Sequence, residues 1–232
     1  MKENYKTWGV RVEDFYTKKT IREKLELLIS FGLLAPSSHN SQPWKYRIDG
    51  QSIEILPDRE RALLVSDPKE KNLFTALGCT IENLVVAADY FGLEPSVAYL
   101  PEGTEIAAKI QCTFPEKDTS KNKKHLIFSI RERRVNRNKY DEAPLPDDFV
   151  KELREYSGHG VDIFVTKDDA ERKQLAEIVM DARVRIFDNA LFRREMSQYK
   201  KNNLTSSFVG ITGHTMGFNT PLSFVAPFAI RF

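Results

Sequence analysis

The sequence has few of the residues that define several protein classes. Its 232 residues include 2 cysteines, Cys79 and Cys112, and no Cys-x-x-Cys motif. A disulfide framework or a cysteine-based zinc site is therefore not expected, whereas a reducing compartment is. Basic residues number 35 and acidic residues 33, so the net charge is only +2. This near balance argues against a nucleic-acid partner bound by charge alone.

Long apolar runs are also missing. The segment from Met1 to Thr20 is polar and contains no apolar stretch of signal-peptide length. No other apolar run has the length needed to span a bilayer. We therefore expect a cytoplasmic protein without a membrane partner. The histidines have no metal-ligand spacing, so no metal site is expected.

Secondary-structure signals are clear in the first half of the chain. Thr20-Ile-Arg-Glu23 has the pattern of a capping box, which predicts a helix that continues to about Leu34. Apolar and polar residues alternate on both sides of Asp49-Gly50, a two-residue turn signal, and this predicts a β-hairpin over residues 44–56.

The next helix is predicted to begin at Asp67-Pro68, with Asp67 as the N-cap and Pro68 at the first helical position. Helical spacing then continues to Tyr90, and Gly92 is expected to end the helix. Strands are predicted at Val97–Leu100 and Ile110–Phe114.

A second unit is predicted to follow the charged segment that ends near residue 120. It has helical patterns at Leu126–Arg133, Pro146–Tyr156 and Asp168–Tyr199, and a strand pattern at Val161–Val165. Because the order helix, strand, long helix occurs twice, we interpret residues 1–120 and 121–232 as two diverged half-repeats of an α+β fold. The long helix is expected to turn one apolar face inward, made of Leu175, Ile178, Val179, Ala182 and Ile186. The tail, residues 203–232, is interpreted as a lid or an arm.

Residues 35–44, Ala-Pro-Ser-Ser-His-Asn-Ser-Gln-Pro-Trp, form the most specific string in the chain. Pro36 and Pro43 stiffen the backbone between them and leave N–H groups free to meet a ligand. The side chains of Ser37, Ser38, Asn40 and Gln42 add hydrogen-bonding groups of short reach. On composition alone, a helix-to-strand loop rich in turn formers is an equally open interpretation.

A second candidate motif occupies residues 131–140. Arg133, Arg134 and Arg137 present guanidinium groups, whose fixed donors suit a phosphate. The alternative is a solvated basic end of a helix, where cations complement the helix dipole.

Together these strings resemble the FMN-binding motifs of the nitroreductase superfamily. Residues 35–44 are similar to the loop that lies against the flavin, and the form with His39 is most similar to the Acg-like branch, in which two nitroreductase-type halves are fused. Arg133, Arg134 and Arg137 resemble the motif that contacts the FMN phosphate and the pyrimidine edge. Val135 replaces a Ser or Thr of that motif, and Asn136 is a candidate to supply the missing contact. The resemblance implies FMN as cofactor, held by Pro36, Ser37, Ser38, Asn40, Gln42, Arg133, Arg134, Asn136 and Arg137.

The resemblance also implies how the site is assembled. In dimeric nitroreductases one subunit supplies the arginine motif and the partner supplies the loop. Here the first half carries the loop and the second half carries the arginines, so one complete site is expected within one chain, as a pseudo-dimer. A homodimer remains a further possibility. The second half is expected to be incomplete relative to the family.

The implied activity is transfer of hydride from NAD(P)H through the flavin to a small acceptor such as a nitroaromatic, quinone or enone. The chemistry lies on the flavin, so no catalytic side chain is assigned. Two alternatives stay open: a flavin-binding or flavin-sequestering protein without turnover, and a truncated remnant that binds no cofactor.

Overall fold

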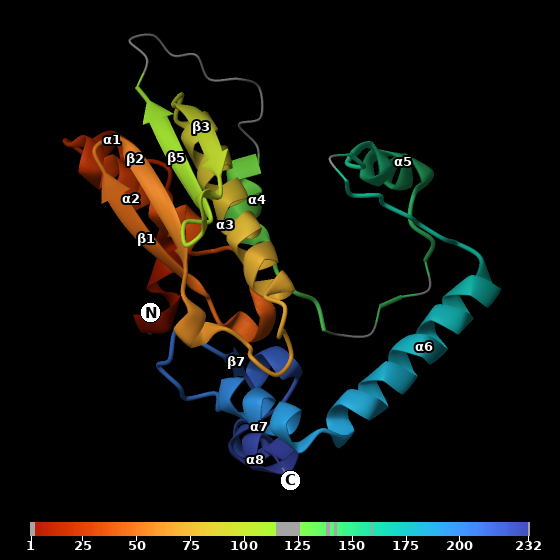
Figure 1. Cartoon of the computed structure of the whole chain (residues 1–232). Helices are drawn as coiled ribbons and strands as arrows, with labels where there is room; N and C mark the ends of the chain where they lie inside the picture. The colour runs from red at the N-terminus through yellow and green to blue at the C-terminus, as the bar shows by residue number, and fades with distance from the viewer. Residues whose placement is uncertain (1–2, 115–125, 138–139, 142, 159, 232) are drawn as a thin grey trace.

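The main body consists of an antiparallel sheet and the helices that pack against it (Figure 1). The computed structural model describes residues 3–114, 126–137, 140–141, 143–158 and 160–231. In the sheet the strand order is β1-β2-β5-β3. The strands are β1 (Trp44–Asp49), β2 (Ser52–Pro57), β3 (Glu94–Tyr99), β4 (Pro101–Thr104), β5 (Ala108–Thr113), β6 (Lys200–Lys201) and β7 (Ile211–Thr212). The α-helices are α1 (Asp14–Thr17), α2 (Ile21–Gly32), α3 (Lys71–Tyr90), α4 (Leu126–Glu132), α5 (Asp147–Glu155), α6 (Asp169–Asp188), α7 (Ala190–Tyr199) and α8 (Thr220–Arg231). The mixed helix and sheet content agrees with the predicted α+β class.

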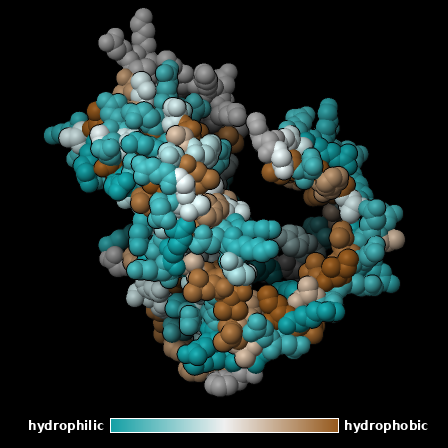
Figure 2. All heavy atoms as spheres, viewed as in Figure 1, coloured by the Kyte–Doolittle hydropathy of each residue, from teal (hydrophilic) through white to brown (hydrophobic). Residues whose placement is uncertain are grey.

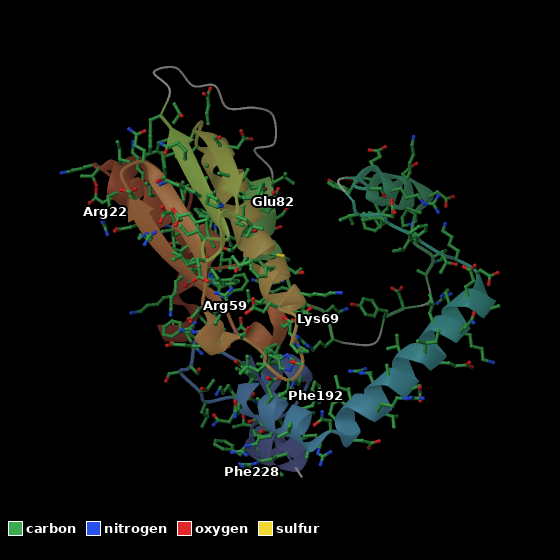
Figure 3. All side chains as sticks on the ribbon, viewed as in Figure 1. Arg22, Arg59, Lys69, Glu82, Phe192 and Phe228 are labelled. Atoms are coloured by element: carbon green, nitrogen blue, oxygen red, sulfur yellow. The ribbon has the colours of Figure 1, made fainter. Side chains whose placement is uncertain are left out.

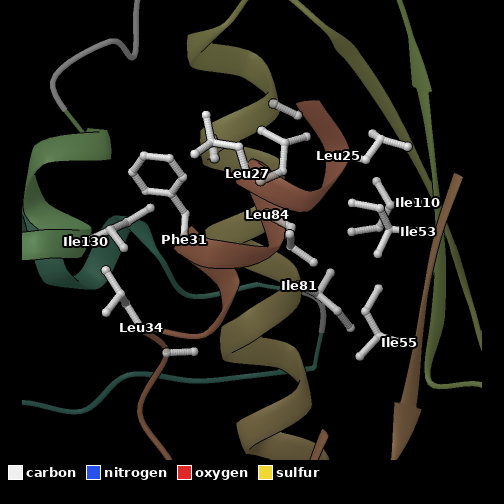
Figure 4. Packing of buried hydrophobic residues seen from close by; sticks show 14 of the residues in the cluster. Leu25, Leu27, Phe31, Leu34, Ile53, Ile55, Ile81, Leu84, Ile110 and Ile130 are labelled. Carbon is white, nitrogen blue, oxygen red and sulfur yellow. The ribbon is translucent and has the colours of Figure 1, made fainter. Parts of the chain in front are cut away.

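Helix α2 begins at the predicted capping box, which is confirmed. The Thr20 hydroxyl accepts a hydrogen bond from the Glu23 N–H at 3.2 Å, and the Glu23 carboxylate accepts from the Thr20 N–H at 2.9 Å. The apolar face of α2 then enters the core, where Leu25, Leu28 and Phe31 are fully buried. Figure 4 shows this face packed among side chains of the sheet, α3 and α4. Burial of each such side chain contributes roughly 1.5–3 kcal/mol.

The predicted start of α3 is wrong by several residues. The helix begins at Lys71, because Glu70 adopts a left-handed backbone conformation with φ 54° that cannot continue an α-helix. Asp67 nevertheless caps the helix, since its carboxylate accepts from the Leu73 N–H at 2.9 Å. The capping residue Asp67 is therefore separated from the first helical residue, Lys71, by a turn that the sequence pattern did not reveal. At the other end, the expected helix end at Gly92 is confirmed, with φ 74°.

The predicted hairpin is present, and its turn lies one residue later than expected. Asp49 pairs with Ser52, so the two-residue connection is Gly50-Gln51 and not Asp49-Gly50. Gly50 has φ 56°, a conformation that glycine adopts without strain. The two other predicted strands correspond to β3 and β5, each shifted toward its N-terminus.

Helix α4 follows the first unit in sequence and packs on α3. Its Ile127 and Ile130 are buried and belong to the same hydrophobic core as α2 and α3 (Figure 4). The body built from residues 1–120 therefore includes a helix from the segment assigned to the second half-repeat. The division into two half-repeats itself remains a prediction.

Two predictions for the second unit are wrong. Val161–Val165 forms no strand, and the backbone there makes one isolated bridge between Gly158 and Val161. The long predicted helix is divided at Asn189, whose ψ of 111° is not helical. The Asn189 side chain explains the break, because its oxygen accepts from the N–H groups of Leu191 and Phe192 and starts α7 anew.

Helix α6 forms an exposed arm between α7 and α5 (Figure 1). The expected inward face of Leu175, Ile178 and Val179 is wrong, because these side chains are 54–59% exposed and no residue of α6 is buried. Figure 2 shows apolar side chains gathered along this arm. The helical spacing of the apolar residues correctly predicts a helix. Among the residues that the structure describes, however, none buries the apolar face of this helix.

The tail contains helix α8. Helix α8 packs on α7 and on β6. Ser223 and Ala226 of α8 are buried, as is Phe192 of α7, which Figure 3 labels beside Phe228 at this end of the molecule. Together α7, β6, β7 and α8 form a small second layer below the main body.

Candidate functional site

The loop of residues 35–44 connects α2 to β1 and is held in an unusual conformation. His39, Asn40 and Gln42 have φ values of 57°, 52° and 50°, in the left-handed region that side chains other than glycine seldom adopt. The Ser37 hydroxyl accepts from the Gln42 N–H at 2.9 Å and closes the loop. Backbone strain of this kind occurs often at ligand sites, because the surrounding structure must enforce it.

The arginine motif lies beside this loop. Arg133 donates from its guanidinium to the carbonyl of Leu34 at 3.3 Å, directly before the loop begins. The two predicted motifs, almost 100 residues apart, are thus brought together within one chain. The arginines do not all converge, however. Arg134 stacks over the ring of Trp8, 4.1 Å from its centroid, and donates to nearby backbone carbonyls.

Positive charge is concentrated on the other side of the loop. Burial and the charge of Arg137 lower the pKa of Lys200. Burial, followed by the charge of Lys200, lowers the pKa of His39, although Glu195 acts in the opposite direction. In the described part of the chain, Arg137 and Lys200 take part in no ion pair. A crowded pair of cations without a carboxylate partner favours an anionic ligand such as a phosphate.

Residues 199–210, which run from the end of α7 into the tail, lie across the loop, and we call them the strap. Asn40 donates from its side-chain amide to the carbonyls of Phe208 at 3.2 Å and Gly210 at 3.0 Å. The Gly210 N–H donates back to the Asn40 carbonyl at 3.1 Å. Gln42 donates to the Phe208 carbonyl as well. Two of the predicted ligand-binding side chains are therefore bonded to the protein's own backbone.

Further contacts fix the strap at its start. The ring of Tyr199 meets the ring of His39 edge-on, with centroids 5.7 Å apart. The Tyr199 hydroxyl donates to the Arg61 carbonyl at 3.5 Å. Arg61 in turn donates to the Gln42 carbonyl at 3.3 Å and lies 3.4 Å from the Asp58 carboxylate. The ion pair of Arg61 with Asp58 thus also supports the loop.

The sequence did not point to several residues that shape the site: Arg61, Glu195, Tyr199, Lys200 and Gly210. Each acts through a partner far away in the sequence, and no local pattern marks such a pairing. Arg59, the neighbour of Arg61 (Figure 3), pairs with Glu70 and Glu105 on the outer surface and takes no part in the loop.

A small hollow with a cavity volume of about 10 Å³ lies between the loop and the start of α3. Ser38, Ser41, Arg61 and Asn72 are among its lining residues. Sites for cofactors usually measure roughly 300–1,000 Å³. The hollow next to the loop is thus smaller than a typical cofactor pocket.

Other site types find no support. Among the residues that the structure describes, no group of three or more His, Cys, Asp or Glu side chains could hold a metal ion. No helix in these segments has both the length and the apolar character needed to cross a membrane.

Comparison with known proteins identifies sequence relatives. No protein-family model matches the chain. Two proteins of Mycobacterium tuberculosis do: a "Putative NAD(P)H nitroreductase", 26% identical over 129 residues that cover 53% of this chain and 36% of the relative, and "Putative NAD(P)H nitroreductase acg", 24% identical over 158 residues that cover 67% and 48%. A crystal structure of a "Putative NADH dehydrogenase/NAD(P)H nitroreductase" from Parabacteroides distasonis aligns with a TM-score of 0.36 and 19% identity, over 46% of this chain and 82% of that chain.

These relatives support the resemblance to the nitroreductase superfamily. The chain is similar in sequence to proteins named as putative NAD(P)H nitroreductases, one of which carries the name acg. The matched segments span less than half of the length of each curated relative.

Proposed function

We propose that this chain binds FMN between the loop and the arginine motif and acts as an oxidoreductase of the nitroreductase type. The observation that carries the proposal is the contact of Arg133 with the Leu34 carbonyl, which brings the two motifs together in one chain. The sequence relationship to proteins named as NAD(P)H nitroreductases supports the same assignment.

The residues fit the two ends of FMN differently. Arg137 and Lys200 suit the phosphate, since they are crowded cations without an acidic partner among the described residues. Arg133 and Asn136 lie in the same segment, whereas Arg134 would have to leave Trp8 to contribute. On the loop, Pro36, Ser37, Ser38, Asn40 and Gln42 would face the ring, and the strap now occupies two of these side chains.

Bound FMN would accept hydride from NAD(P)H and pass it to a small organic acceptor such as a nitroaromatic, quinone or enone. The protein's own part is to position the ring and to hold the phosphate. Positively charged groups near the loop and the backbone N–H groups of residues 37–39 would stabilise negative charge on the reduced ring, since the N–H groups of residues 40–42 bond within the loop. The site would form within one chain, as an internal pseudo-dimer of the Acg-like type.

Titration of the purified protein with FMN, followed by anaerobic addition of NADPH, tests this function. We expect quenching of flavin fluorescence on binding, weaker binding in Arg137→Gln, and loss of the oxidised flavin absorbance after NADPH is added. Arg183→Gln, on the exposed arm, is the matched control that should bind as the wild type does. A protein that leaves FMN fluorescence unchanged at all concentrations would contradict the proposal and favour the cofactor-free alternative.

A second candidate is flavin binding without turnover. It is favoured by one observation, the strap that covers the loop on the side where its amides are presented. It predicts that FMN binds and that NADPH and NADH both fail to bleach it, while dithionite succeeds.

A further inference from the structure

The strap presents a specific set of hydrogen-bonding groups to the loop. From the strap come the Phe208 carbonyl, the Gly210 N–H and the Gly210 carbonyl, which is an acceptor, a donor and an acceptor. On the loop, the Asn40 side-chain amide donates to both carbonyls, the Gln42 side-chain amide donates to the Phe208 carbonyl, and the Asn40 carbonyl accepts from the Gly210 N–H. Each of the three strap groups thus has a partner of opposite kind on the loop.

The same order of groups occurs on a cyclic imide, where an N–H stands between two carbonyls. A uracil ring has this edge, and so has the pyrimidine ring of a flavin. We propose that residues 40–42 form a recognition edge for a cyclic imide, and that residues 208–210 of the strap occupy this edge as an internal substitute for the ligand. The inference rests on the proposed function for the identity of that ligand, and it adds that ligand and strap compete for one edge.

The strained backbone supports this assignment. Asn40 and Gln42 are both left-handed, with φ of 52° and 50°, and the side-chain amides of both donate to the Phe208 carbonyl. A helix-to-strand connection does not need such strain, and strain that the fold maintains is typical of ligand sites. The hydrogen bonds between the strap and the loop involve residues that solvent can reach, because Asn40 and Phe208 are both exposed.

The strap is also held at points that need not break when the edge is released. Asn4 donates to the carbonyls of Thr205 and Ser207, at 3.3 and 3.2 Å. On the other side, the Gly213 N–H donates to the Lys201 carbonyl at 2.9 Å. Displacement of residues 208–210 can therefore remain local. A ligand that must displace the strap binds with an apparent affinity reduced by the fraction of open molecules.

Gly210 makes the strap testable by one substitution. Its φ is 105°, and an added Cβ would lie 2.7 Å from the Tyr199 carbonyl oxygen and 2.8 Å from the Lys201 side chain. Gly210→Ala should thus push the strap off the edge. Gly217 is the matched control, because its φ of 79° carries a similar backbone cost but a Cβ there meets nothing within 4 Å.

The experiment measures binding of lumiflavin, which has the imide edge and no phosphate, and of 3-methyllumiflavin, whose N–H is blocked. We expect Gly210→Ala to bind lumiflavin about tenfold more tightly than the wild type, because the strap's hydrogen bonds no longer compete. Gly217→Ala should match the wild type, and the methylated ring should bind weakly to all three. Equal lumiflavin affinity in wild type and Gly210→Ala would overturn the inference.

A measurement on the unaltered protein guards against a variant that fails to fold. Hydrogen exchange of the Gly210 N–H should accelerate at saturating lumiflavin if the strap is displaced, whereas slower exchange would contradict competition. The outcomes separate the two proposals. Strap displacement by lumiflavin without bleaching of bound FMN by NADPH would refute only the enzymatic function. FMN reduction with an unchanged Gly210 N–H would refute only the competition.

Discussion

Glu195 of α7 accepts hydrogen bonds from both the backbone N–H and the hydroxyl of Ser66, at 3.0 and 2.7 Å, although 129 residues separate the two. The same carboxylate accepts from the Val65 N–H at 2.9 Å. One side chain thus fastens the second layer of the molecule to the loop that precedes α3. The position of Tyr199 and Lys200 beside His39 depends on this attachment, since they end the helix that bears Glu195.

Substitution of Glu195 should loosen α7. Glu195→Ala removes three hydrogen bonds at a partly buried carboxylate, and we expect a loss of about 1–2 kcal/mol in the free energy of unfolding. Urea denaturation monitors the change, and hydrogen exchange in α7 should increase. Glu177→Ala, on the exposed arm, should stay within about 0.5 kcal/mol of the wild type. Equal stability of both variants would show that the attachment is not used in solution.

A pair of hydroxyl groups inside the main body should contribute to the stability of the fold. The hydroxyls of Tyr46 and Thr80 lie 2.6 Å apart, and Thr80 also donates to the Gly32 carbonyl at 2.9 Å. Thr80→Val leaves the Tyr46 hydroxyl without this partner, whereas the Gly32 carbonyl keeps its hydrogen bond from the Ala35 N–H at 3.0 Å, so we expect a loss of about 1–3 kcal/mol. Thr75→Val, on the exposed side of the same helix, is the control for β-branched replacement. Thermal unfolding of the two variants decides the comparison.

Stability should depend on the ionisation of His39. Burial lowers its pKa in the folded state, so the unfolded chain binds the proton more readily and stability falls as pH drops below the ordinary histidine value of about 6.5. The charged groups around the ring are Lys200, which lowers the pKa further, and Glu195, which raises it. We expect the melting temperature to decrease between pH 7.5 and 5.5. His39→Asn keeps a residue that tolerates positive φ, and should reduce this decrease.

The exposed arm should bind hydrophobic dyes. Ile178, Val179 and Val184 of α6 are 55–59% exposed, and apolar patches of this kind are adhesive in water. We expect strong fluorescence of anilinonaphthalene sulfonate with the folded protein, and a clear reduction in the double variant Ile178→Lys/Val184→Lys. Glu177→Lys changes charge without removing apolar surface and serves as the control. Dye fluorescence that is unaffected by the double variant would place the apolar surface elsewhere.

Local chemistry explains which parts of the fold could be predicted from sequence. The capping box at Thr20, the hairpin at residues 44–56 and the end of α3 at Gly92 depend on neighbours within a few residues, and all three are found. The start of α3 was missed because Glu70 adopts positive φ, which no pattern at Asp67-Pro68 reveals. The break at Asn189 was missed because an asparagine inside a periodic stretch can either point to solvent or cap a new helix.

In the candidate site, too, features that depend on neighbouring residues could be predicted from the sequence, whereas contacts between distant residues could not. The loop and the arginine motif were recognisable from their own residues, and the structure brings Arg133 next to Leu34. The tail is expected as a lid or an arm, but no sequence pattern identifies the contacts of the strap with the loop. Its bonds join Asn40 to Gly210 across 170 residues, through backbone atoms that every residue possesses. Only glycine's tolerance of φ 105° at residue 210 left a trace in the sequence.

The division at Asn189 has a consequence for how the two helices melt. Helix formation is cooperative along a continuous hydrogen-bonded segment, and a residue with ψ of 111° interrupts that segment. Because the Asn189 side chain supplies a separate start for α7, unwinding of α6 does not have to propagate into it. The arm can fray or refold while α7 keeps its register and Glu195 keeps its hold on Ser66. Unwinding of α6, or binding to its apolar surface, therefore does not have to change the positions of the residues around His39.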